Sequence, residues 1–196
     1  MCLWSTFRRE TRGTAAVEMA LVTALLAYPV LNVADIGMYA YQSMQVANAA
    51  QAGARAAWSQ CNTSTMWPAT ANCGTNGAAL TSVVSGAAGI QSTSLGNKVT
   101  LASGYPEEGY YCATTTNALT ATTGGTGTNP TSAGAAPAKP SPYDCSTVAG
   151  AVVGATPGDY VSVSVTSTYT PLFTGVQTVA SLLPSPITST AWQRMD

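Results

Sequence analysis

Charge is what this sequence lacks most. Only 8% of its 196 residues are charged, against about 25% in ordinary soluble domains. The net charge is −1, so there is no basic field to hold nucleic acid. Histidine is absent, which removes the commonest general base and the commonest metal ligand. These absences argue against nucleic-acid binding and against most acid–base and metal chemistry.

A long apolar run is present near the N-terminus. It begins at Ala15 and contains only two charged residues, Glu18 and Asp35, before Tyr41. The uncharged stretch between them, residues 19–34, would rise about 24 Å as a helix, against about 30 Å of bilayer hydrocarbon. A carboxylate within such a run costs roughly 2.5–3.5 kcal/mol on insertion scales and usually signals function. The run predicts a membrane helix, and Glu18 is its candidate functional residue.

Basic residues fix the expected orientation of this helix. Arg8, Arg9 and Arg12 precede the apolar run, and Arg55 is the only nearby basic residue after it. The positive-inside rule therefore places the N-terminus in the cytoplasm and the bulk of the chain outside. Pro29 lies in the middle of the run and should kink the helix.

Three other interpretations compete with a functional membrane helix. A secretory signal peptide requires small residues at the cleavage site, and Leu25-Leu26-Ala27 fits this poorly. A twin-arginine signal at Arg8-Arg9 lacks the usual hydrophobic continuation. A plain single-pass anchor with an incidental Glu18 remains the serious alternative.

Three stretches of the first quarter of the chain resemble a known family. Arg12-Gly13-Thr14-Ala15-Ala16-Val17-Glu18-Met19-Ala20-Leu21-Val22 resembles the start of TadE-like minor pilins, which belong to tight-adherence (Flp) pili within the type IV pilin superfamily. The Asp35-Ile36-Gly37 step and the run from Tyr41 to Arg55 are similar to the same family. One departure from the family pattern is Met19, where the family usually has Phe or another large apolar residue, and Met is equally apolar.

The resemblance implies a processing and assembly mechanism. A prepilin peptidase would cut between Gly13 and Thr14, so that Glu18 becomes the fifth residue of the mature chain. Glu18 would then meet the new N-terminal amine of a neighbouring subunit, and two opposite charges in lipid relieve each other's desolvation cost. The implied partners are the peptidase, other pilin subunits, the pilus assembly platform and the membrane, with no nucleic acid, small-molecule substrate or cofactor.

The sequence predicts three regions. Residues 1–13 are a basic leader peptide, residues 14–59 form one long helix with a transmembrane half, and residues 60–196 form a periplasmic domain. The small residues from Val46 to Ala57 should pack mostly on the protein's own domain. The expected location is the bacterial inner membrane, with the C-terminal domain in the periplasm or incorporated in an extracellular pilus.

An α+β fold is expected for the outer domain, with the long helix packed on a small antiparallel sheet. The patterns predict a helix over residues 78–88 and a short helix over 175–182. They predict strands over 98–103, 159–169 and 187–195. The strand at 159–169 alternates Val with Ser or Thr, which indicates one buried and one solvated face. Residues 113–142 lack large apolar side chains and read as a long, partly disordered loop.

Four cysteines follow the membrane segment: Cys61, Cys73, Cys112 and Cys145. An even number in an exported domain indicates two disulfides, for which three pairings exist. We favour Cys61–Cys73 and Cys112–Cys145, because each pair closes off a loop. Zinc binding is a weak alternative because no close ligand pairs and no histidines are present. Cys2 lies in the leader and should be free.

No enzymatic constellation emerges from the remaining polar residues. Glu107-Glu108 lies between Pro106 and Gly109 and reads as a solvated turn rather than a catalytic pair. Gly124-Gly125-Thr126-Gly127 lacks the partners of a phosphate-binding loop. The sequence and the resemblance therefore predict a membrane-anchored structural subunit or assembly factor of a tight-adherence pilus rather than an enzyme. The alternative is a single-pass anchored envelope adhesin or ligand-binding domain.

Overall fold

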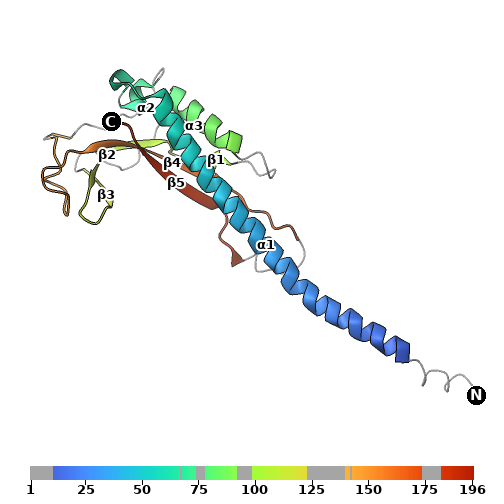
Figure 1. Ribbon diagram of the computed structural model, residues 1–196. Coiled ribbons are helices and arrows are strands. Elements are labelled where there is room, and N and C mark those ends of the chain that lie inside the picture. The colour runs from blue at the N-terminus through green and yellow to red at the C-terminus, as the bar shows by residue number, and fades with distance from the viewer. Residues whose placement is uncertain are drawn as a thin grey trace, which may run out of the picture. The chain divides into compact units, whose positions relative to one another are not determined.

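The protein has an α+β fold, as the sequence predicted (Figure 1). This computed structural model describes residues 11–66, 68–73, 78–91, 99–122, 140–141, 143–173 and 182–196. They fall into two compact units. The first contains residues 11–41 and the described part of 170–183; the second contains residues 42–169, where described, and 184–196.

Helix α1, Thr11–Gln60, is continuous for 50 residues and agrees closely with the predicted span of 14–59. Good helix formers dominate it, and Pro29 is its only proline. The helical assignment continues through Pro29 without a break. Two side chains in this part of α1 donate hydrogen bonds to a backbone carbonyl one turn earlier. The Thr23 hydroxyl donates to the Met19 carbonyl at 2.7 Å, and the Asn32 amide donates to the Tyr28 carbonyl at 2.8 Å.

The second unit has a core built from small and branched side chains. The outer part of α1 contributes a buried face of Val46, Ala49, Ala50, Ala54 and Ala57. This confirms that the small residues of this segment pack on the protein's own domain. Strand β4, Gly158–Ser167, and helix α3, Ala78–Gln91, provide the facing residues. These are the buried side chains of Val161, Val163, Val165, Leu80, Val84 and Ala88.

Gly53 marks the closest approach within this core. A Cβ at this position would lie 3.1 Å from Cγ1 of Val163 and 3.2 Å from Cγ1 of Val84. Both separations are tighter than ordinary van der Waals contact. A glycine on α1 therefore lets the helix contact the sheet and α3 together (Figure 1).

Strand β4 is the centre of a five-stranded antiparallel sheet. Strand β5, Ile187–Arg194, pairs along one edge of β4, from Tyr160↔Arg194 to Ser167↔Ile187. On the other edge β4 pairs with β2, Glu107–Ala113, and further along with β1, Thr100–Leu101. Strand β3, Leu119–Ala121, pairs with β2 and ends the sheet on that side.

The expectation that β4 has a solvated face is wrong. Its Ser162 and Ser164 are buried, as are the valines on the opposite face. Both edges of β4 are paired, and large side chains of its neighbours flank these small hydroxyls. The ring of Tyr111 in β2 lies 5.0 Å from that of Trp192 in β5, edge to face, across this face.

Other predictions differ at their boundaries. The strand expected over 98–103 is only the two-residue β1 within the described residues. Residues 113–142 are not a loop throughout, because β3 lies within them, and residues 123–139 and 142 are outside the described residues. So are the Gly124–Gly127 piece and most of the short helix expected over 175–182. Two further short helices are η2, Ser64–Met66, and α2, Ala69–Asn72.

Candidate functional site

The N-terminal part of α1 is apolar and exposed. Every residue from Gly13 to Val30 is exposed, including the large side chains of Leu21, Leu25 and Val30. Among the described residues, α1 is the one helix that is long and apolar enough to cross a membrane. An exposed apolar surface of this extent marks a membrane or protein interface.

The predicted processing and assembly residues all lie on this exposed segment. Gly13 has no atom within 4 Å of the position of a Cβ. Thr14 follows it, and Glu18 is one helical turn further on, with its side chain exposed among apolar residues. Gly13, Thr14 and Glu18 are thus accessible to other molecules, and no described residue forms an ion pair with Glu18.

Asp35 has a role that the sequence did not reveal. It is fully buried, and one of its carboxylate oxygens accepts the backbone N–H of Leu172 at 3.0 Å. The two residues are 137 positions apart in the sequence and belong to the same compact unit. Asp35 therefore fastens the segment that follows β4 to α1. Its position at the end of the uncharged stretch was the available signal, but nothing pointed to Leu172.

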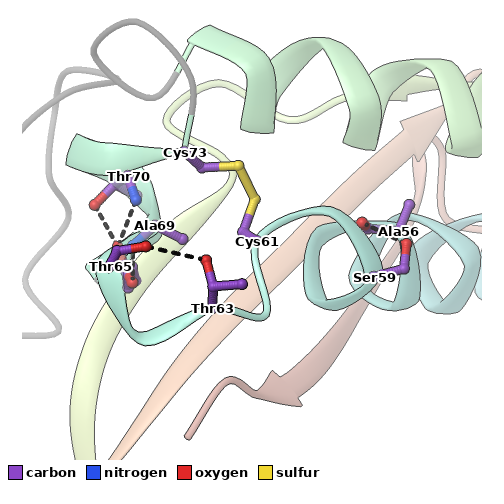
Figure 2. The surroundings of a disulfide bond; sticks show 9 residues. Ala56, Ser59, Cys61, Thr63, Thr65, Ala69, Thr70 and Cys73 are labelled. Carbon is purple, nitrogen blue, oxygen red and sulfur yellow. Dashed lines mark hydrogen bonds between the residues drawn. A yellow bond between two sulfur atoms is a disulfide. The ribbon is translucent and has the colours of Figure 1, made fainter.

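The four cysteines form two disulfides, Cys61–Cys73 and Cys112–Cys145, which are the pairs that the sequence favoured. The first joins the end of α1 to the end of α2, with a Cα–Cα distance of 5.6 Å (Figure 2). The second joins β2 to the segment before β4, with a Cα–Cα distance of 5.8 Å. Cys112 and Cys145 pack with Val148 in a small buried cluster away from α1.

Glu108 is not in a solvated turn. Glu107 and Glu108 are the first residues of β2, and Glu108 is buried. Its carboxylate accepts the N–H groups of Ala69, at 2.5 Å, and Thr70, at 2.7 Å, as well as the Thr70 hydroxyl. These N–H groups begin α2, where the helix provides no internal acceptor. The carboxylate of Glu108, from strand β2, thus caps helix α2. The residue at the N-cap position, Pro68, makes no side-chain hydrogen bond to the helix.

Asp159 lies beside Glu108 on the same face of the sheet, because Tyr110 pairs with Asp159 and Glu108 pairs with Val161. Burial raises the pKa of Asp159 to about 8, and the negative charge of Glu108, a hydrogen bond with it and the charge of Asp196 act in the same direction. Burial and the charge of Asp159 also raise the pKa of Tyr110 to about 12. Asp159 is therefore predominantly protonated at neutral pH.

These features do not converge on one chemical centre. Among the described residues, no three side chains of His, Cys, Asp or Glu lie together in a way that could hold a metal ion. The Glu108–Asp159 pair is enclosed by the domain and stabilises α2. Glu18, the predicted assembly residue, is instead exposed on the apolar first part of α1.

Comparison with known proteins gives a family match for the N-terminal part of the chain. Residues 13–55 match the family model described as TadE-like protein. No curated protein and no solved structure matches the chain. The match spans the exposed apolar segment of α1 and its outer continuation as far as Arg55, so the predicted resemblance is confirmed and residues 13–55 are a TadE-like segment.

Proposed function

We propose that this protein is a pilin-like structural subunit of a tight-adherence pilus, anchored in the bacterial inner membrane by α1. A TadE-like segment is typical of pilin-like proteins that associate with such pili. The observation that carries the proposal is an exposed apolar helix with a single exposed carboxylate, Glu18, five residues after Gly13. A simple anchor has no need for that charge.

Processing by a prepilin peptidase is part of the proposal. Cleavage between Gly13 and Thr14 would remove the basic leader and leave a mature chain that begins with an apolar helix. Gly13 has open space around its Cα, and the lack of a side chain permits the close approach of a peptidase to the backbone. The three proposed regions are then the leader at 1–13, the helix at 14–59 and a periplasmic domain at 60–196.

Glu18 would act in assembly. In lipid its carboxylate carries an unfavourable desolvation energy unless a cation lies close. The α-amine that cleavage creates on Thr14 of a neighbouring subunit is such a cation. Pairing of the two groups would select one axial register between subunits, because a shift along the helix separates the charges.

Two measurements on the full chain in cells with the other pilus proteins test this function. Mass spectrometry of the membrane-extracted protein should give a chain that starts at Thr14, and Gly13→Leu should retain the leader. Glu18→Ala should be cleaved normally but should enter pili, or bind other pilins, at a strongly reduced level. Glu18→Asp, which keeps the charge, is the matched control. An intact Met1 in the wild-type protein, or normal assembly of Glu18→Ala, would refute the proposal.

A further inference from the structure

Strand β5 leaves one edge of the sheet without a partner among the described residues. In an antiparallel ladder the N–H and C=O groups of alternate residues point to opposite edges. The Met195 N–H donates to the Asp159 carbonyl at 2.8 Å, which fixes that alternation. The backbone groups of Thr190 and Trp192 therefore point away from β4, toward the free edge.

A groove of about 410 Å³ runs between this edge and α1. Figure 1 shows β5 alongside the outer part of the helix. Two alanines of α1, Ala47 and Ala54, leave space for side chains that enter from outside. The other lining residues are Gln51 and Arg55 of α1 and residues 189–193 of β5.

Arg55 gives the groove its charge. It is exposed and forms no ion pair with a described residue. Arg194, at the end of β5, is instead paired with Asp196 at 2.7 Å. A guanidinium beside an open groove favours a carboxylate, which it can bind through two parallel hydrogen bonds.

We propose that the free edge of β5 binds an extended segment of another protein as an added strand, with a carboxylate of that segment on Arg55. Backbone hydrogen bonds to Thr190 and Trp192 would provide affinity, and alternate side chains of the segment would enter the groove. The edge is eight residues long and contains no proline or acidic residue. Native proteins rarely leave such an edge uncovered.

The charge also selects the occupant. A second copy that pairs through its own β5 would bring Ser189, Ala191 and Gln193 toward the helix, and β5 contains no Asp or Glu for Arg55. A different polypeptide with an acidic residue satisfies Arg55. This interaction goes beyond the proposed function and does not use Gly13 or Glu18. The proposed interaction and the proposed function can therefore fail independently of each other.

Photo-crosslinking in native membranes tests the proposal. The full chain carries p-benzoylphenylalanine in place of Gln51, an exposed residue of the groove. Mass spectrometry of the crosslinked peptide should identify an extended segment of another protein with an Asp or Glu. Thr190→Pro removes an N–H that faces the partner and not the β4 ladder, so it should lower the yield about fivefold, the effect of one lost hydrogen bond.

Two controls separate this surface from a general loss of structure. Thr188→Pro removes a donor from the same edge but outside the groove, and it should leave the yield unchanged. Arg55→Glu should abolish the crosslink, and replacement of the partner's acidic residue by Arg should restore it. A crosslink to lipid, to this chain or to a second copy would overturn the proposal. So would the lack of any crosslink, or a yield that Thr190→Pro leaves unchanged.

Discussion

Glu108 and Asp159 are both buried and lie side by side on one face of the sheet. Glu108 accepts three hydrogen bonds from Ala69 and Thr70, and its negative charge lies beside Asp159. Asp159 is buried beside that negative charge, so its own ionisation is unfavourable. A proton on Asp159 lets the two carboxyl groups coexist, and the domain thereby keeps the cap on α2.

The protonation of Asp159 makes the stability of the domain depend on pH. The folded state holds a proton up to about pH 8, whereas the unfolded chain loses it near pH 4. Stability should therefore fall as pH rises through this window, by up to about 1.4 kcal/mol per pH unit from this group. The charged or titratable groups that interact with it are Glu108, Tyr110, Tyr143 and Asp196.

Asp159→Asn tests this dependence. The amide keeps a donor for Glu108 but has no proton to lose, so the variant should be more stable than the wild type at pH 8 and should show a flatter pH profile. The measurement is Tm between pH 4 and 9. Asp144→Asn is the control, because Asp144 is exposed and hydrogen bonds from Ser146 lower its pKa below this window. Identical profiles for wild type and Asp159→Asn would contradict the account.

Gly53 provides a second prediction at the scale of the residue. Gly53→Leu should destabilise the domain by about 1–3 kcal/mol, because its side chain must displace Val163 and Val84. Gly86→Leu is the matched variant, since Gly86 lies on α3 with no atom within 4 Å of a Cβ. It should stabilise by up to about 1 kcal/mol through helix propensity. Denaturant unfolding measures both, and equal effects would show that α1 does not contact the sheet closely at Gly53.

At the scale of the element, α1 does two different things along its length. Its first part is exposed and apolar, while its outer part is buried against β4 and α3. Asp35 lies between these parts and holds the backbone of Leu172. A buried carboxylate that accepts a backbone N–H fixes the position of the segment that carries this N–H.

Asp35→Ala should release the segment around Leu172. The side chain of Ala cannot accept the N–H, so hydrogen exchange at Leu172 should become faster, by about tenfold or more for a charge-assisted bond worth 1.5–3 kcal/mol. Asp35→Asn keeps an acceptor oxygen and should retain much of the protection. Exchange at Val163 in β4 serves as an internal reference. Unchanged exchange at Leu172 in the alanine variant would show that Asp35 does not hold this segment.

The sequence predicted the elements better than it predicted their polar contacts. The apolar run of α1, the valine alternation of β4 and the proline-bounded β5 are local patterns, and their bounds agree with the structure. The contacts of Glu108 and Asp35 span 39 and 137 residues. Burial of these carboxylates is created by partners that come together only in the folded chain, and no local spacing encodes that. The prediction of a solvated face on β4 was wrong for the same reason.

At the scale of the whole molecule, membrane topology and cysteine chemistry make one joint prediction. The orientation that we propose from Arg8, Arg9 and Arg12 would place the outer domain in an oxidising compartment, in which the disulfides Cys61–Cys73 and Cys112–Cys145 persist. In the chain-entropy model the shorter loop contributes about 3 kcal/mol and the longer loop about 4 kcal/mol. The proposed orientation therefore makes export a condition for the stability of the domain.

Cysteine labelling in intact spheroplasts tests topology and oxidation together. Val153 is fully exposed, so Val153→Cys should react with a membrane-impermeant maleimide from outside the cell. The four native cysteines of the outer domain should react only after reduction and unfolding. Cys2, retained in a Gly13→Leu background, should stay unlabelled until the membrane is permeabilised, because the leader faces the cytoplasm. Labelling of Cys2 from outside the cell would contradict the proposed orientation. Free thiols at the four positions in the folded protein would show that disulfides do not stabilise the domain.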